Sequence, residues 1–347
     1  MKFHPNIFIV GRKYQIVIVT EQPAQVCIWL GGKTYFEDNG GIIPSLNCVH
    51  KISVPQSALD KAGKYTVVVR NTVEKKPYRP VYGERKTYEY TFKNQAYDDL
   101  KAVYFADIHS VYRLATALVG DREIDFVIFN GDFGETRSTE DILRLNEFLS
   151  SLTKGEIPVL FVRGNHDTRG AYAERLYETV GMDGQKGYFS FTFRSLCGVA
   201  LDCGEDKPDD HIEYGGANDF ESYRKRQTEF LRRVRLPKDK TAFAVCHVPF
   251  MLESAMHGEF DIERKEYARW AKSLNGLNLR FMICGHTHRF AYVPEGNDVQ
   301  SHDYPVLVAS EFRGGVTIGG AFLDFTKTAV RVTYADSDGK TYGEYEL

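Results

Sequence analysis

The chain has 347 residues, more than a single hydrophobic core usually serves, so we expect about two domains. Hydrophobic residues make up 43% and charged residues 26%, as in soluble globular proteins. No apolar run approaches the ~20 residues that a membrane-spanning helix needs, and the N-terminus lacks the pattern of a secretory signal peptide. The six cysteines form no C-x-x-C pair. We therefore expect a protein of a reducing compartment, the cytoplasm, with no membrane partner.

The net charge of −3 conceals an uneven distribution along the chain. Residues 1–96 contain 14 Lys and Arg against 7 Asp and Glu, a net charge of +7. Residues 97–347 contain 30 against 40, a net charge of −10. A basic N-terminal part is thus joined to an acidic remainder, which supports a division into two domains with different surfaces.

Residues 1–96 are predicted to be all-β. Short runs rich in β-branched and aromatic residues are separated by clusters of Gly, Asn, Asp and Pro. The expected strands are 14–20, 25–31, 64–71 and 86–94. Strands of this length and spacing favour a small β-sandwich, similar in architecture to immunoglobulin and fibronectin type III domains.

From residue 97 onward, apolar strands alternate with helical segments. The segment 139–152 has its apolar residues at helical spacing, among them Ile142 and Leu145. This order predicts an α/β domain over 97–347, with a parallel or mixed sheet flanked by helices. The expected strands are 101–107, 125–132, 157–167, 188–203, 241–247, 279–285 and 305–310, with more in 316–347. The expected helices are 110–119, 139–152, 171–179, 219–235 and 263–274.

Polar residues follow five of these strands directly. The first three strands end in FADIHS, NGDFG and RGNHD, and two later strands end in AVCHVP and MICGHTH. Because ligands bind at the carboxyl ends of strands in open α/β sheets, we expect these residues to share one site. They are Asp107, His109, Asp132, Asn165, His166, Asp167, His247, His286 and His288.

The residue types in this set suit metal ions. Carboxylate, imidazole and amide oxygen together favour divalent or trivalent first-row metals. Glycines beside Asp132, Asn165 and His286 let the backbone turn sharply, so that metals or phosphate can approach. Two ions about 3.5–4 Å apart can clamp an in-line phosphoryl displacement, and Asp132 is the natural bridge between them.

Each motif taken singly also has a structural interpretation. Gly-Asn-His-Asp can be a turn, and His247 behind a cysteine can be a buried, hydrogen-bonded histidine. Five such motifs at successive strand ends make coincidence a poor explanation. The combination therefore favours a metal centre.

The order Asp-x-His, Gly-Asp, Gly-Asn-His-Asp, a lone His and Gly-His-x-His, over about residues 100–310, resembles the calcineurin-like metallophosphoesterase superfamily. The resemblance implies a four-layer αββα sandwich, preceded here by the β-sandwich module. It also implies two bound ions, of Mn, Fe or Zn. One would be held by Asp107, His109, Asp132 and His288, and the other by Asp132, Asn165, His247 and His286.

The same resemblance implies hydrolysis of a phosphate monoester or diester, through attack by a hydroxide that bridges the metals. His166 matches the catalytic histidine of the family, which is not a ligand; it would stabilise the transferred group or protonate the leaving oxygen. Asp167 would orient a histidine or a ligand, or would cap a turn.

Two positions depart from subtypes of the superfamily. The domain order is similar to that of purple acid phosphatases, which carry Tyr where Glu135 stands and lack the histidine at His109. Protein serine/threonine phosphatases have Gly-Asp-x-x-Asp-Arg, but here Arg137 comes one place late. The resemblance is therefore to the superfamily and to neither subtype.

Candidate contacts for a small phosphorylated substrate are Arg289, Arg137 and His211. Arg163 and Arg169 also lie beside the motifs, and an arginine could clamp phosphate, although each arginine taken singly is more often a surface residue or one that lies behind the ligands. His211 lies in the long polar segment 203–220, which we expect to act as a lid that shapes the pocket.

A competing hypothesis concerns the segment 74–88, EKKPYRPVYGERKTY, which is basic and interleaved with tyrosine. Such a segment can bind nucleic acid or another anionic polymer, which would make this a binding protein with a vestigial phosphoesterase domain. It can also be a solvated strand edge, where Lys and Pro prevent unwanted pairing. The complete set of metal motifs favours an enzyme whose N-terminal module packs on the catalytic domain or mediates a homodimer.

Overall fold

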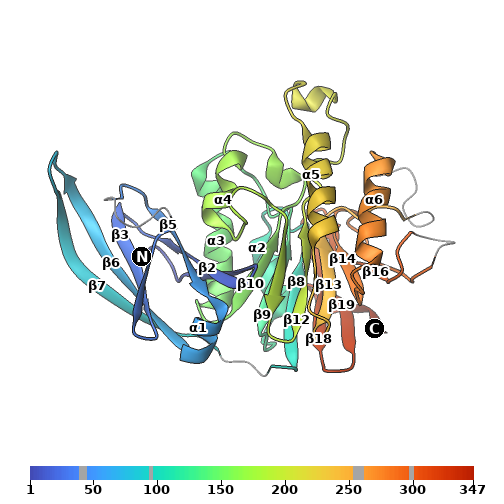
Figure 1. Ribbon diagram of the computed structural model, residues 1–347, viewed down its shortest axis with the longest axis horizontal. Helices are drawn as coiled ribbons and strands as arrows, with labels where there is room; N and C mark the ends of the chain where they lie inside the picture. Colours follow the sequence, from blue (N-terminus) through green and yellow to red (C-terminus); the bar gives the residue numbers. More distant parts are fainter. Residues whose placement is uncertain (39–44, 94–96, 253–261, 297–300) are drawn as a thin grey trace.

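The computed structural model describes residues 1–38, 45–93, 97–252, 262–296 and 301–347 (Figure 1). Within these ranges the strands form three sheets, of ten, six and four strands. No helix in the described part of the chain is both long and apolar enough to cross a membrane.

The larger sheet is mixed, and its strand order is β20-β19-β18-β8-β9-β10-β1-β2-β5, with β17 paired to β18. The four central strands β8, β9, β10 and β1 run parallel to one another. Nearly all their residues are buried, as expected for strands covered on both faces. The strands are β1 Asn6–Val10, β2 Lys13–Val19, β5 Val49–Pro55, β8 Leu100–Phe105, β9 Phe126–Asn130, β10 Pro158–Val162, β17 Glu311–Arg313, β18 Thr317–Phe325, β19 Val330–Asp336 and β20 Thr341–Glu346.

The smaller sheet has the order β11-β12-β13-β14-β16-β15 and packs face to face with the larger sheet. Phenylalanine rings fill the space between them: Phe126 lies 5.1 Å from Phe193, and Phe243 lies 5.8 Å from Phe325, measured between ring centroids. The strands are β11 Phe189–Phe193, β12 Leu196–Leu201, β13 Thr241–Cys246, β14 Phe281–Cys284, β15 Ala291–Val293 and β16 Val306–Val308.

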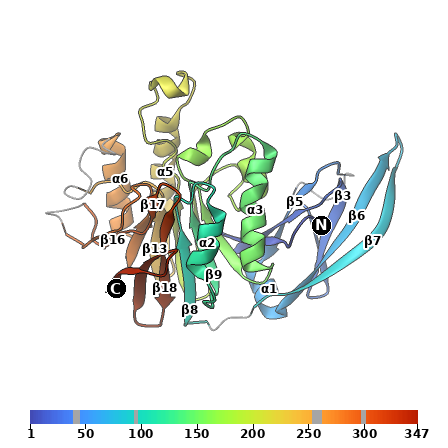
Figure 2. The same cartoon turned by 180° about the vertical axis from the view of Figure 1, so that it is seen from behind.

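Helices cover the outer faces of both sheets. Figures 1 and 2, which show opposite sides of the molecule, place α2 and α3 over the larger sheet and α5 and α6 over the smaller one. This arrangement confirms the predicted αββα sandwich. The helices are α1 Gln56–Ala62, α2 Tyr112–Val119, α3 Thr139–Thr153, α4 Leu176–Thr179, α5 Phe220–Arg233 and α6 Arg264–Asn275. Short 3₁₀ turns are η1 His166–Thr168, η2 Ala173–Arg175 and η3 Ile212–Tyr214. The helix expected over 171–179 is only η2 followed by the single turn of α4.

The N-terminal part contributes to two sheets. Four of its strands form a separate antiparallel sheet in the order β4-β3-β6-β7, which confirms an all-β element before the α/β domain. Its other strands, β1, β2 and β5, extend the larger sheet, because β1 pairs in parallel with β10. The predicted boundary at residue 96 lies outside the described residues, but the larger sheet contains strands from both sides of it. The separate sheet consists of β3 Ala24–Leu30, β4 Lys33–Phe36, β6 Lys64–Lys75 and β7 Pro80–Thr91.

Removal of residues 1–96 should therefore leave an unstable or insoluble remainder. The deletion takes away three strands of the larger sheet and exposes the edge of β10. We expect loss of cooperative thermal unfolding, measured by circular dichroism.

A matched control replaces residues 75–80, the tip of the β6–β7 hairpin, by Asn-Gly, which suits a two-residue hairpin turn. This variant should unfold like the wild type. A well-folded, monodisperse fragment 97–347 would show that the N-terminal strands are dispensable.

A buried histidine in the smaller-sheet half predicts acid sensitivity. The His302 ring nitrogens lie 2.8 Å from the carbonyl oxygen of Phe250 and 2.9 Å from the hydroxyl of Tyr304. Burial lowers the pKa of His302 to about 4. The unfolded chain, with a histidine pKa of about 6.5, therefore takes up a proton first as the pH falls, and folding stability is lost between about pH 6.5 and 4.

We expect the low pKa of His302 to reduce the free energy of unfolding by about 2 kcal/mol between pH 7.5 and pH 5. His302→Gln should be less stable than the wild type at pH 7.5. Its free energy of unfolding should fall by about 2 kcal/mol less than that of the wild type between the two pH values, as measured by urea titration. The control His4→Gln removes an exposed imidazole and should keep the wild-type difference. Equal acid sensitivity of His302→Gln and wild type would contradict this assignment.

Candidate metal centre

The candidate ligands meet where strands of the two large sheets end. β8, β9 and β10 run parallel in the larger sheet, as do β13 and β14 in the smaller one. The loops that follow them touch. A side chain at Gly131 would overlap the backbone of Gly164, and one at Gly285 would overlap the carboxylate of Asp107. Glycine is therefore needed where these loops cross, and the strand ends converge on one site.

The backbone at the site is strained. Five candidate ligands have positive φ angles, a conformation that side-chain-bearing residues rarely adopt. They are Asp107 (55°), His109 (39°), Asp132 (53°), His286 (72°) and His288 (55°). Each such residue costs roughly 1–3 kcal/mol and persists only where the surrounding structure enforces it, most often at functional sites.

The first cluster of candidate ligands consists of Asp107, His109 and His288. The Nε2 atoms of the two histidines are 3.0 Å apart, and His288 Nε2 lies 3.3 Å from Asp107 Oδ1. Asp132, the fourth predicted ligand, belongs to an overlapping cluster with His109 and His166. The structure thus brings together the four residues predicted to hold the first ion.

The second cluster consists of Asp132, His247 and His286. His247 Nε2 lies 3.3 Å from Asp132 Oδ2 and 3.5 Å from Asp107 Oδ1. Asn165 Oδ1 lies 3.0 Å from His286 Nδ1, so it faces the same space. All four predicted ligands of the second ion are adjacent, and Asp132 also belongs to the cluster with His109 and His166.

Hydrogen bonds outside the clusters fix which ligand atoms face inward. The backbone N–H of His286 donates to Asp107 Oδ2 at 2.7 Å, and that of His166 donates to Asp132 Oδ1 at 2.9 Å. His247 Nδ1 donates to the carbonyl at the end of β9 at 2.6 Å, so its Nε2 carries a free lone pair in the neutral ring. Each inward atom is thereby held for coordination.

Asp107 Oδ1 and His247 Nε2 test whether metal ions fit. Both atoms are buried, and neither has a hydrogen-bond partner among the described residues. A buried polar atom without a partner is costly, so native structures rarely leave one without a compensating group. A cation between these atoms would satisfy both, and the donor types suit divalent or trivalent ions. The residues of this site therefore fit a metal centre.

The charges of the site are strongly coupled. Burial acts to lower the pKa of His247, but Asp132 and Asp107 outweigh it and raise that pKa to about 10. Burial acts to raise the pKa of Asp132, but the opposing charge of His247 holds it well below its usual range. Burial and the charge of His247 lower the pKa of His286 to about 4, which favours its neutral, metal-binding form. Metal uptake must therefore displace a proton from His247.

His166 and Asp167 occupy different places. The His166 side chain is 44% exposed, and its Nε2 lies 3.9 Å from Asp132 Oδ2 at the mouth of the site. Asp167 is buried and accepts backbone N–H bonds from Asp132, Phe133 and Gly164, at 3.0, 3.2 and 2.8 Å. Burial, with the nearby charge of Asp132, raises the pKa of Asp167 to about 7. Its contacts are those of a residue that positions the Asp132 loop, while the catalytic assignment of His166 remains a prediction.

The predicted substrate contacts are not gathered at the site. Arg137 is exposed and pairs with Glu135 at 3.0 Å. Arg289 is exposed beside His288. His211 accepts a hydrogen bond from the N–H of Glu213 at the start of η3, in the segment 203–220. No contact described for these three side chains joins them to the candidate ligands.

Arg169, which lies beside the Gly-Asn-His-Asp motif, and Asp206, which no motif singled out, do reach the site. Arg169 Nη1 lies 3.5 Å from His166 Nε2, and Asp206 Oδ2 lies 3.8 Å from His286 Nε2. A cavity of about 140 Å³ beside the clusters is lined by His109, Ser110, Gly134, Glu135, Thr136, His166, Arg169 and Gly170. The sequence pointed to Asp206 only through the polar segment 203–220, and it did not indicate which acidic residue of that segment would lie near the candidate ligands.

The bridging role of Asp132 has a direct test. Asp132→Asn keeps the side-chain volume but removes the charge shared by both clusters, so it should retain at most one ion where the wild type retains two. Metal content is measured by mass spectrometry after free metal is removed. Asp338→Asn, at an exposed turn, is the control and should bind like the wild type. Two ions in Asp132→Asn would contradict the bridge.

Comparison with known proteins agrees with this geometry. The family model of calcineurin-like phosphoesterases matches residues 100–290, which include Asp107 and both histidines of the GHTH motif. No curated protein sequence matches the chain.

Three solved structures share the fold. A purple acid phosphatase, PPD1, from yellow lupin (Lupinus luteus) has a TM-score of 0.58 at 12% identity, covering 99% of this chain and 73% of its own. A structure of PhoD has a TM-score of 0.54 at 8% identity, covering 98% and 91%. A dimetal phosphatase from Danio rerio has a TM-score of 0.50 at 12% identity, covering 72% and 99%. The first two similarities extend over the N-terminal strands.

Proposed function

Because this chain belongs to the calcineurin-like phosphoesterase family, we propose that it is a hydrolase of phosphate esters that works with two bound metal ions. The observation that carries the proposal is the three neighbouring clusters of candidate ligands, two of which share Asp132, with inward atoms of Asp107 and His247 that a cation would satisfy. A purely structural histidine cluster would not need buried acceptors without partners, nor backbone strain at five of its residues.

The ions would be held by the two predicted sets of four residues, with Asp132 in both. When bound, they would supply Lewis acidity toward the phosphoryl group and would lower the pKa of a bound water. Manganese, iron and zinc all accept this mixture of ligands, and metal availability often decides between them. The chain itself holds the ligand atoms in place through Asp167 and the bonds to Asp107 and Asp132.

Two features of His166 support a direct role on the substrate: its exposure and its place on the cavity wall. Its ring lies 5.3 Å from that of His109, and both line the cavity beside the clusters. Its backbone N–H donates to Asp132 Oδ1, which holds the residue beside the candidate ligands, while its side chain is 44% exposed. We propose that it stabilises the transferred group or donates a proton to the leaving oxygen.

The size and lining of the cavity support one class of substrate. The cavity volume of about 140 Å³ suits a phosphate group with a small substituent. Among the described residues that line this cavity, Glu135 is the one with a carboxylate. We propose a small phosphorylated substrate in which a strongly anionic leaving group is disfavoured near Glu135. A diester and a monoester both remain within this proposal.

His166→Ala should retain both ions but lose turnover by about 100-fold or more, because the general acid is lost while the ligands are intact. The rates of hydrolysis of p-nitrophenyl phosphate and bis-p-nitrophenyl phosphate by protein reconstituted with Mn²⁺, Fe²⁺ or Zn²⁺ give the measurement. His4→Ala is the control, since this histidine is exposed and distant in the fold from the strand ends. Unchanged turnover of His166→Ala at full metal loading would refute its role.

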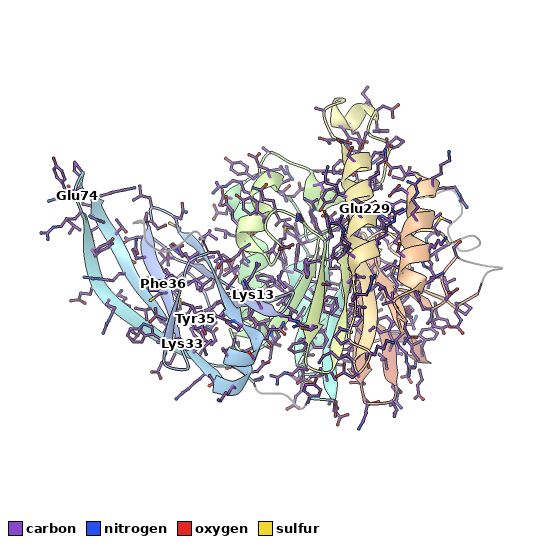
Figure 3. All side chains as sticks on the ribbon, in the orientation of Figure 1. Lys13, Lys33, Tyr35, Phe36, Glu74 and Glu229 are labelled. Carbon is purple, nitrogen blue, oxygen red and sulfur yellow. The ribbon has the colours of Figure 1, made fainter. Side chains whose placement is uncertain are left out.

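A second function rests on the β6–β7 hairpin. Figure 3 shows Glu74 near its outer end, away from the α/β sandwich. Tyr78 at its tip is fully exposed, and Val73 is 68% exposed. We propose, as the competing candidate, that this basic hairpin binds an anionic polymer. Retention of the wild type on heparin, lost when residues 75–80 are replaced by Asn-Gly, would support it; equal retention of the two proteins would not.

A further inference from the structure

The carboxylate of Glu205 anchors an arginine beside the metal centre. Arg169 donates to it through two nitrogens, Nε to Oε1 at 2.6 Å and Nη2 to Oε2 at 2.7 Å. Thr168 and the Tyr214 hydroxyl donate to the same carboxylate at 3.1 and 3.0 Å. Glu205 is only 1% exposed. A buried carboxylate with four donors cannot turn away, so it fixes the plane of the guanidinium.

The backbone of Arg169 is held as well. Its N–H donates to the carbonyl of His166 at 3.1 Å, and its own carbonyl accepts from the hydroxyl of Thr136. Asp206 Oδ1 takes a further contact from Nη2 at 3.3 Å. The side chain therefore has little conformational freedom left to lose when a ligand binds.

One edge of this guanidinium remains open. Nε and Nη2 face Glu205 and Asp206, but Nη1 faces the cavity and lies 3.5 Å from His166 Nε2. Nη1 and the His166 ring therefore border the same cavity, and an anion there could accept a charge-assisted hydrogen bond from Nη1.

The other arginines near the motifs are placed differently. Arg163 is engaged by Asp202 at 2.7 Å with its side chain only 17% exposed, and Arg137 is exposed and paired with Glu135. Arg289 is exposed and makes no described side-chain contact with the clusters. Arg169 differs from them in three respects: buried Glu205 holds its guanidinium, its side chain is 33% exposed, and it lies on the cavity wall.

We propose that Arg169 binds a phosphate oxygen of the substrate through Nη1, and that Glu205 is the positioning residue that holds it there. The inference rests on the proposed function and assigns a substrate contact within that site. Because Glu205 and Asp206 occupy the rest of the guanidinium, the contact to phosphate is made by Nη1 alone, as one charge-assisted hydrogen bond.

The test is the binding of inorganic phosphate to the Mn²⁺-loaded full-length protein, measured by titration calorimetry alongside metal content. Loss of one charge-assisted hydrogen bond should raise the dissociation constant about 10- to 100-fold in Arg169→Ala. Arg169→Lys should recover little of the loss, because lysine cannot form the two-point pair with Glu205. Glu205→Gln should weaken phosphate binding about 3- to 10-fold, since it leaves the guanidinium in place but weakens its mount.

Arg175 and Glu178 supply the matched control. They form a two-nitrogen pair of the same kind, at 3.4 and 2.9 Å, on the outer segment of η2 and α4. Arg175→Ala and Glu178→Gln should bind phosphate like the wild type. Their loss of thermal stability should be that expected when an exposed ion pair is removed. If Arg169→Ala does not fold, Arg169→Lys and Glu205→Gln carry the test.

The outcomes separate this inference from the proposed function. Unchanged phosphate affinity in folded, metal-loaded Arg169 variants would overturn the inference, even if the wild type hydrolyses esters. Weakened affinity in these variants, with a wild type that hydrolyses none of the esters, would support the inference while the proposed function fails. A wild type that holds two ions but binds no phosphate would overturn the inference, while ester hydrolysis would still decide the proposed function.

Discussion

The buried contact of His247 with two carboxylates is the constraint on which the site depends. Its Nε2 lies 3.3 Å from Asp132 and 3.5 Å from Asp107. Two buried carboxylates repel each other, so they need a nearby positive charge if both are ionised. A proton on His247 provides that charge when no metal is present, and bound cations would provide it in the working protein. The inward atoms without hydrogen-bond partners and the residues with positive φ angles lie at this same site.

The fold meets this demand by bringing rigid strand ends together. Loops after β9 and β10 cross at Gly131 and Gly164, and Asp167 ties them with three backbone hydrogen bonds. The larger sheet that carries these loops continues through β1 into the N-terminal strands. The N-terminal part therefore supports β10, the strand that precedes Asn165 and His166.

The candidate metal ligands could be identified from the sequence because each follows an apolar strand within a short, recognisable motif. The alternation of strands and helices predicted a sheet flanked by helices, whereas the four αββα layers were implied by the resemblance to the superfamily. The pairing of β1 with β10 could not be predicted, since it joins residues about 150 positions apart and both strands are simply apolar. The Arg169–Glu205 pair was missed for a related reason: its members are 36 positions apart, and only tertiary structure selects them from many surface charges.

The central claim is that the strand ends hold two metal ions that share Asp132. Anomalous diffraction from crystals of the full-length protein grown with Mn²⁺ tests it most directly, because it locates the ions without reference to activity. The account predicts two separate peaks, one among Asp107, His109 and His288 and one among Asn165, His247 and His286, with Asp132 touching both. A single peak, or peaks elsewhere in the fold, would contradict it.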